Sequence, residues 1–197
     1  MKFTIFYLSL FSMLISFSVS AVDKNGKFAI KGVGNTSCAE FVDHTKNDRY
    51  QKFLFAGWIN GYITAQNQHL KENFDVTSWE NIETIGNYLV SHCKKHPKLS
   101  FFQAVTLLIN EIYEERIAEF KGANSIEKGI SGEQVYAQVV ARVQQTLKDK
   151  GQYDGKVNGK INEALSKAVT AYKKEQGLVA NGELDQQVLF KLFREEK

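Results

Sequence analysis

Apolar residues in the first half of the chain recur at three- and four-residue spacing, which is typical of helices with one buried face. The first such stretch runs from Asp48 to about His69 and predicts one long helix. Gly57 and Gly61 lie inside it, four residues apart. Because a missing side chain lets a neighbouring backbone approach, the pair predicts a close helix contact rather than a ligand site. The apolar positions of this helix are Phe53, Leu54, Trp58, Tyr62, Ile63 and Ala65.

Capping patterns predict two further helices in this half. In Thr77-Ser78-Trp79-Glu80 the threonine hydroxyl and the glutamate carboxylate can satisfy each other's free backbone amides, so a helix is expected from there to Cys93. Pro97 prevents its continuation, since proline fixes φ and lacks a backbone donor. The same pattern in Ser100-Phe101-Phe102-Gln103 predicts a third helix that extends toward Phe120.

Residues 122–132 contain three glycines and two serines without periodicity, which indicates a flexible linker. The sequence Ser131-Gly132-Glu133-Gln134 then predicts the start of a helix that ends at Gly151. The apolar positions of this helix are Val135, Val139, Val140, Val143 and Leu147.

An internal repeat follows, in which residues 157–165 (VNGKINEAL) align without gaps with residues 180–188 (ANGELDQQV). Each copy has an Asn-Gly turn, and Asn162 and Asp185 are suited to cap the helices after those turns. Two turn-and-helix units after one leading helix predict a compact three-helix domain. The whole chain is therefore expected to be all-α, with two small helical domains.

Residues 1–21 are typical of an export signal. One lysine precedes an apolar run from Phe3 to Phe17, and Val19 and Ala21 fit the small-residue positions before a cleavage site. An uncleaved anchor helix is the alternative, although the run is short and rich in serine. No later apolar run approaches 18 residues, so no membrane span is expected after cleavage, and the predicted location is the periplasm. Residues 22–36, rich in glycine and lysine, predict an extended arm.

Cys38 and Cys93 are the only cysteines. In an oxidising compartment an isolated pair is most simply a disulfide. Both cysteines belong to the first half, so the bridge would staple a domain that spans residues 37–121. The second domain is predicted to span residues 133–197.

The composition excludes several classes of protein. With 43% hydrophobic residues, 24% charged residues and a single proline, the chain is neither disordered nor collagen-like. Its net charge is only +3, and no basic block longer than two residues occurs. Nucleic acid is therefore not an expected partner, since phosphate binding needs a concentrated basic face.

The C-terminal half resembles the peptidoglycan-binding-like domain of bacterial cell-wall proteins. The residues that carry the resemblance are Val143, Leu147, Gly151, Tyr153, Gly155, Gly159, Ile161, Ala168, Val169, Tyr172, Gly177, Leu178, Gly182, Leu184, Leu189 and Leu192. The resemblance implies the three-helix fold and peptidoglycan as a partner. Three positions depart from the family: Asn162 replaces a usual glycine, Leu165 a usual threonine and Lys173 a usual glutamine.

Wall binding needs hydrogen-bond partners for sugars and peptide amides, and a cation for a stem-peptide carboxylate. Polar residues crowd the first turn of this domain, and others lie on the following helix and in the second turn. The alternative is that Tyr153 packs in the core and that the others are solvated turn residues. The candidate peptidoglycan-binding residues are Tyr153, Asp154, Lys156, Asn158, Lys160, Tyr172, Lys173 and Asn181.

Residues 36–120 resemble small exported helical proteins that include the HdeA-like acid-stress chaperones and immunity proteins against type VI secreted amidases. The resemblance rests on Cys38-Ala39-Glu40-Phe41, residues 57–63, Asn67, Tyr88-Leu89, Cys93, His96-Pro97 and Ala104. It implies that the disulfide joins the first segment to the end of the second helix. It also implies a periplasmic protein partner and no catalysis.

Catalytic and metal patterns are weak. His92, Cys93 and His96 could share a helix face, but Cys93 is better used in the disulfide, so no metal site is expected. No phosphate loop, Gly-x-Ser-x-Gly elbow or His-Glu-x-x-His occurs, and no cofactor is expected. Glu111, Glu114, Glu115 and Glu119 could serve a muramidase-like reaction, but their spacing is typical of a solvated face.

The sequence therefore predicts a non-enzymatic exported protein that binds peptidoglycan through its C-terminal domain and a protein partner or stress signal through its N-terminal domain. One alternative is a periplasmic immunity protein or acid-stress chaperone whose C-terminal domain no longer binds the wall. The other is a cryptic cell-wall hydrolase that uses the glutamate-rich helix. The four histidines leave a pH-dependent partner switch open.

Overall fold

The computed structural model describes residues 22–129 and 132–195. The predicted signal peptide, residues 1–21, lies outside the described residues, as does Ser131. The described residues fall into two units, residues 22–30 and the described residues from Lys31 onward. In the first unit, residues 22–30 contain a turn in which Asp23 Oδ1 accepts hydrogen bonds from the backbone amides of Asn25 and Lys27.

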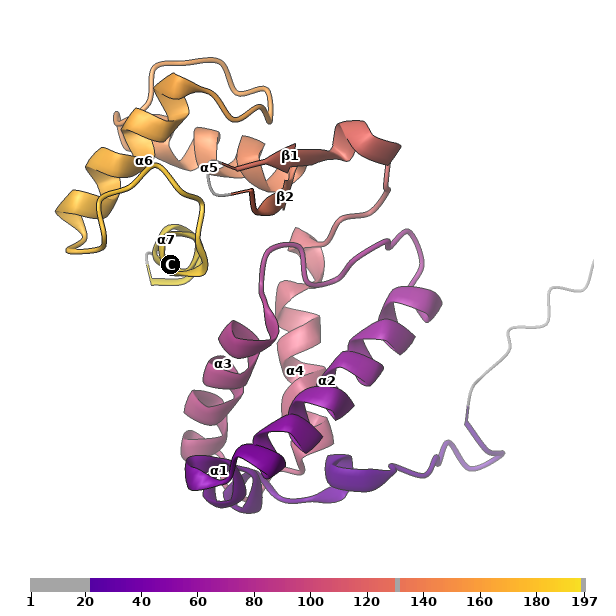
Figure 1. Ribbon diagram of the computed structural model, residues 1–197. Helices are drawn as coiled ribbons and strands as arrows, with labels where there is room; N and C mark the ends of the chain where they lie inside the picture. The colour runs from indigo at the N-terminus through magenta and orange to yellow at the C-terminus, as the bar shows by residue number, and fades with distance from the viewer. Residues whose placement is uncertain (1–21, 130–131, 196–197) are drawn as a thin grey trace, which may run out of the picture. The chain divides into compact units, whose positions relative to one another are not determined.

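The second unit begins with four α-helices that pack against one another (Figure 1). A short 3-10 turn, η1 (Gly32–Asn35), precedes them. The four helices are α1 (Cys38–Asn47), α2 (Arg49–His69), α3 (Ile82–Lys95) and α4 (Phe101–Ile112).

Two of the predicted helices in this half have the expected start. The stretch from Asp48 to His69 is α2, and Asp48 Oδ1 accepts a hydrogen bond from the amide of Gln51 at 3.1 Å as its N-cap. The capping pattern at Ser100 and Gln103 is also confirmed, because each side chain accepts from the other's backbone amide at the start of α4. The extension of α4 toward Phe120 is wrong, since α4 ends at Ile112 and the 3-10 turn η2 (Tyr113–Glu115) follows.

The predicted start of a helix at Thr77 is wrong. Asn81, and not Thr77, caps α3, and its side chain accepts a hydrogen bond from the amide of Thr84. The Thr77 hydroxyl and amide instead donate to Asp75 Oδ1. The backbone of Asp75 also pairs with Ile117 as an isolated β-bridge. These contacts hold the segment before α3 in a non-helical conformation.

An aromatic cluster and a disulfide form the centre of this helical core. The rings of Phe41, Phe55 and Phe101 lie 4.5–4.9 Å apart between centroids. The predicted disulfide is confirmed, and it joins Cys38 at the start of α1 to Cys93 near the end of α3. Both cysteines are fully buried, so the bridge lies inside the core.

Gly57 and Gly61 do not make the predicted close helix contact. Both glycines are exposed on α2, and a Cβ atom at either position would meet no atom within 4 Å. The four-residue spacing therefore has no packing role here.

The C-terminal part of the unit contains a small antiparallel sheet and three short α-helices, which confirms the predicted three-helix fold (Figure 1). A π-helical turn, Lys191–Glu195, continues the last helix. The elements are η3 (Gly122–Ser125), β1 (Ile126–Lys128), β2 (Gln134–Tyr136), α5 (Ala137–Asp149), α6 (Glu163–Glu175) and α7 (Gln186–Phe190).

Strand pairing changes the expected start of the leading helix. Gln134–Tyr136 is strand β2 and pairs with β1, so that Ile126 lies opposite Tyr136. As a result α5 begins at Ala137, three residues later than the predicted capping sequence. Residues 122–128 of the predicted linker form η3 and β1. The predicted domain limits, residues 37–121 and 133–197, stay predictions.

The repeat has the predicted local structure. Asn162 caps α6 and Asp185 caps α7, and each side chain accepts a hydrogen bond from an amide three residues later. Gly159 lies between α5 and α6 with a φ of 71°, and a Cβ atom there would be 2.5 Å from the Ala137 carbonyl oxygen. Glycine is therefore required at this turn by both backbone conformation and space.

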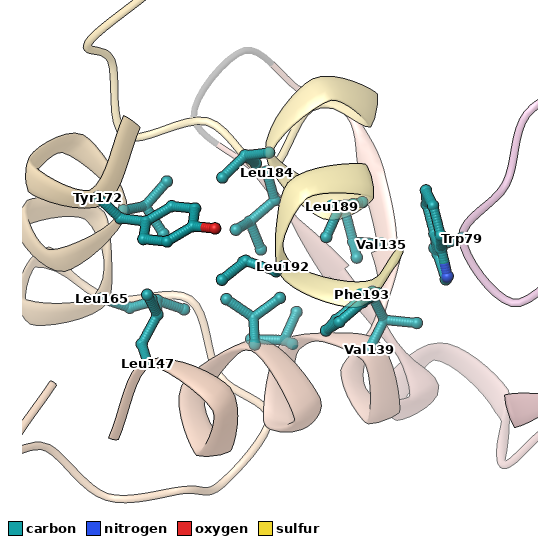
Figure 2. Packing of buried hydrophobic residues seen from close by; sticks show 14 of the residues in the cluster. Trp79, Val135, Val139, Leu147, Leu165, Tyr172, Leu184, Leu189, Leu192 and Phe193 are labelled. Carbon is teal, nitrogen blue, oxygen red and sulfur yellow. The ribbon is translucent and has the colours of Figure 1, made fainter. Parts of the chain in front are cut away.

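The buried core around α5, α6 and α7 also includes two residues from the first half of the chain, Trp79 and Ile117. Figure 2 shows Trp79 facing Phe193, and the two ring centroids lie 5.8 Å apart. Inside the same core, α5 contributes Val139 and Leu147, and α6 contributes Leu165 and Tyr172.

Candidate functional site

The first candidate site is the turn between α5 and α6, which one buried glutamine organises. Gln144 has no exposed surface. Its Oε1 accepts hydrogen bonds from the amides of Asn158 and Gly159, both at 2.9 Å. Its Nε2 donates to the Lys160 carbonyl oxygen at 2.9 Å and to the Asn158 side chain at 3.3 Å. The side chain of Gln144 on α5 therefore holds the backbone of residues 158–160 in place.

Tyr153 fixes the beginning of the same turn. Its hydroxyl donates to the Lys156 carbonyl oxygen at 3.2 Å, and the ring is 5% exposed. A Cβ atom at Gly155 would lie 2.4 Å from this ring, so glycine is needed there for the tyrosine to fold over the chain. Tyr153 thus packs in the core rather than offering an aromatic face to a ligand.

An ion pair attaches the turn to strand β1. Lys160 Nζ lies 2.7 Å from Glu127 Oε1, and the amide of Ile161 donates to Glu127 Oε2 at 3.2 Å. The hydrogen bond from Lys160 lowers the pKa of the Glu127 carboxyl below its ordinary value. The lysine keeps 56% of its side chain exposed, so it can still meet an anion from solvent.

The second candidate turn, between α6 and α7, is organised by a buried lysine. Lys173 is fully buried, and its Nζ lies 2.5 Å from Asp185 Oδ2. The same Nζ donates to the side chain of Asn181 and to the Glu183 carbonyl oxygen. Where the family usually has a glutamine, this chain has a cation that joins the two helices and the turn between them.

The structure separates the eight predicted ligand residues into two groups. Asp154, Lys156, Asn158 and Lys160 are exposed on the first turn, and Asn181 is half-buried in the second. The remaining three, Tyr153, Tyr172 and Lys173, are buried. Their side chains are enclosed by the fold and do not form part of the exposed surface of the two turns.

Two residues that shape the first turn were missed from the sequence, Gln144 and Glu127. Gln144 lies between Val140 and Leu147 on the buried stripe of α5, and a polar residue at an apolar position was the available signal. Glu127 carried no comparable signal, because its role depends on the pairing of β1 with β2.

A buried charge cluster joins the last turn of the chain to residues of the first half. Arg194 Nη2 lies 2.7 Å from Glu80 Oε1, and its Nη1 lies 2.8 Å from Glu115 Oε1. Arg142 binds the other oxygen of Glu115 at 2.6 Å. Burial raises the pKa of the Glu80 carboxyl, although the positive charge of Arg194 opposes that shift. Near this cluster, Gln186 accepts hydrogen bonds from the Asn81 amide and the Thr84 hydroxyl.

Two of the four glutamates that suggested a hydrolase are engaged in other contacts. Glu115 binds the two arginines, and Glu111 accepts a hydrogen bond from the Tyr88 hydroxyl. The rings of His92 and His96 lie 4.7 Å apart, and Cys93 between them is in the disulfide. Within residues 22–129 and 132–195, no group of three or more His, Cys, Asp and Glu side chains could hold a metal ion.

In the described part of the chain, no helix combines the length and the apolar character that crossing a membrane requires.

Two protein-family models match the chain, one in its N-terminal part and one in its C-terminal part. A model of a peptidoglycan binding domain matches residues 136–192, which include α5, α6, α7 and both turns. A model of the HdeA/HdeB family matches residues 5–103, about half of the chain. The chain belongs to the HdeA/HdeB family. Neither a curated protein nor a solved structure matches it.

The two matches confirm both resemblances seen in the sequence. The HdeA/HdeB match includes α1, α2 and α3 and the disulfide between Cys38 and Cys93. In this HdeA/HdeB-family protein, the peptidoglycan-binding domain follows the family region along the same chain. Together the matches support peptidoglycan binding and a periplasmic stress-chaperone type of role.

Proposed function

We propose that this is a non-enzymatic periplasmic protein. It binds peptidoglycan through the first turn of its C-terminal domain, and it binds a protein partner or stress signal through its HdeA/HdeB region. The observation that carries the proposal is the turn of residues 154–160, which lies within the matched peptidoglycan-binding region and presents four polar side chains on a fixed backbone.

The exposed side chains of the turn suit the chemistry of the wall. Lys156 and Lys160 can pair with a stem-peptide carboxylate, and charge-assisted hydrogen bonds of this kind are among the strong ones. Asn158 is oriented before a ligand arrives, because its Oδ1 accepts hydrogen bonds from the Lys160 amide and from Gln144. A polar group that is already in position loses less entropy when it binds.

Co-sedimentation of the chain from Val22 onward with purified sacculi tests this proposal. We expect the protein to pellet at moderate salt, and Lys156→Ala combined with Asn158→Ala to weaken binding roughly tenfold, or about 1.4 kcal/mol. Lys167→Ala is the charge-matched control, since Lys167 is 75% exposed on α6 outside the turn. Salt matters because a net-positive protein can adhere to an anionic wall without a specific site.

Two results would contradict the proposal. The first is recovery of the protein in the supernatant at every salt concentration, and the second is a loss of binding in the control as large as in the turn variant. The second result would assign the adhesion to net charge alone.

One observation favours a second candidate function, an immunity protein or acid-stress chaperone whose C-terminal domain does not bind the wall. Three of the candidate wall-binding side chains make contacts inside the domain: Tyr153, Tyr172 and Lys173. Their two aromatic rings and one ammonium group are therefore not exposed to a ligand. A protein of this second kind is expected in the supernatant after co-sedimentation with sacculi, and it binds its protein partner through the HdeA/HdeB region.

A further inference from the structure

A groove of about 680 Å³ lies between α1, α2 and α3, in the HdeA/HdeB region. Its apolar lining includes Phe41, Phe55 and Ile59, which also belong to the buried core. Phe53 extends this surface outward and is 62% exposed. The volume falls within the range of about 300–1,000 Å³ that is common for small-molecule sites.

A glycine in the middle of α3 borders the groove. Gly86 lines the groove, and a Cβ atom at this position would meet no atom within 4 Å. Its φ is not positive, so neither backbone conformation nor close packing requires glycine here. Glycine inside a helix is destabilising relative to alanine. The groove therefore has open space beside Gly86, which a larger side chain at this position would occupy.

The charged groups that line the groove are mostly positive. Lys46 of α1, Lys52 of α2 and Lys94 of α3 each contribute one ammonium group, and Glu83 is the one acidic residue of the lining. All three lysines are exposed, and among the described residues none of them has an ion pair. A lysine can lay its aliphatic stem on an apolar surface while its charge stays in water.

We propose that this groove binds a single-chain anionic amphiphile, of the chemical class of a long-chain carboxylate. The acyl chain lies on the aromatic and aliphatic floor beside Gly86, and the carboxylate pairs with the lysines. A typical protein partner buries about 800 Å² on each side and contacts 20–30 residues. This groove is smaller than such an interface, so its dimensions and charge favour a small amphiphile.

Isothermal titration of the chain from Val22 onward with dodecanoate, below its micellar concentration, tests the proposal. We expect saturable binding of one dodecanoate per chain. Dodecyltrimethylammonium has the same chain length and the opposite charge, and we expect it to bind at least about tenfold more weakly.

Two groups of variants locate the site. Gly86→Leu fills the groove and is expected to weaken dodecanoate binding at least about tenfold. Gly57→Leu is its matched control, because Gly57 is another helical glycine with open space around it and does not line the groove. The combined change of Lys46, Lys52 and Lys94 to Gln tests the charged rim without filling the groove.

Several results would overturn the proposal. These are the absence of saturable dodecanoate binding, equal binding of both amphiphiles, and binding that survives both Gly86→Leu and the lysine changes. If Gly86→Leu does not fold, the lysine variant alone decides. If an acidic amphipathic peptide binds and dodecanoate does not, the occupant is a protein helix and the proposal is wrong.

Discussion

Replacing Gln144 with leucine removes the hydrogen bonds that fix the first turn of the peptidoglycan-binding domain. The leucine fills a similar volume but leaves the amides of Asn158 and Gly159 and the Lys160 carbonyl oxygen without their partner. Gly159 is buried, and an unsatisfied buried group costs about 1–3 kcal/mol. Asn158 and Lys160 are exposed and can turn to water, so they add less.

We estimate the loss of polar contacts at about 3 kcal/mol, offset by about 1 kcal/mol from the added apolar burial. The net expectation is a free energy of unfolding lower by about 2 kcal/mol. In a protein of this size that lowers the unfolding midpoint by roughly 4–8 °C. Urea unfolding followed by circular dichroism measures the change, and hydrogen exchange at the amides of Asn158 and Gly159 reports on the turn itself.

Gln145→Leu is the control for this change. Gln145 is the next residue of α5, and it is exposed and bonded only to the exposed side chain of Asp149. Its replacement is expected to change stability by less than about 0.5 kcal/mol. Equal costs for the two variants, or unchanged exchange protection at Asn158 and Gly159 in Gln144→Leu, would refute this account of the turn.

Three further predictions concern the buried charges and the histidines. Lys173→Met leaves Asp185 without its cation and is expected to lower the free energy of unfolding by about 1–3 kcal/mol. Lys173→Gln keeps a hydrogen-bond donor and is expected to lose less stability. Equal free energies of unfolding for the two variants in urea would contradict this prediction. Arg194→Leu leaves the carboxylate of Glu80 buried without its arginine, and we expect the free energy of unfolding to fall by about 2–4 kcal/mol. An unchanged denaturation midpoint would show that the charge cluster does not contribute to stability. Burial lowers the pKa of His92 in the folded protein below its ordinary 6.5. As the pH falls below 6.5, His92 is protonated in the unfolded chain before it is protonated in the folded protein, so the free energy of unfolding decreases. His92→Gln should flatten that pH dependence, and an identical slope in the variant would exclude His92 as its source.

Signals that act over a few residues predicted structure well. Ser100 with Gln103, Asn162 and Asp185 all cap helices at the predicted positions, because the side chain and the amide it binds are three residues apart. These helix caps do not depend on distant parts of the chain. The disulfide between Cys38 and Cys93 joins residues 55 apart, and it was predicted instead from the compartment and the count of cysteines.

The errors arose where distant segments meet. The capping pattern at Thr77 failed because Asp75 pairs with Ile117, which lies 42 residues later in sequence numbering. The start of α5 moved to Ala137 because β2 pairs with β1. Helix α1 was missed for a different reason, because a local signal was overlooked. Ser37 and Glu40 form the same capping box that identified α4, and Cys38, Phe41 and Thr45 form the buried face of α1.

The sequence located the segment that forms the candidate site, but it did not show which side chains of the site are exposed. The turn of residues 153–160 was identified from its polar composition, and four of its residues are exposed as expected. Tyr172 and Lys173 were included as candidate wall contacts on the helix that follows this turn. The burial of Lys173 could not be predicted from its position on the helix alone, because it depends on contacts of its ammonium group with Asp185 and Asn181 in the following turn.

Chemical-shift mapping with a soluble disaccharide-tetrapeptide fragment of peptidoglycan tests the central claim most directly. Titrating the isotope-labelled chain should shift the amide signals of residues 154–160 and leave those of α1, α2 and α3 unchanged. Saturable shifts confined to the first turn are the predicted result. No shifts at a saturating concentration, or shifts confined to the HdeA/HdeB region, would contradict the claim that this turn binds the cell wall.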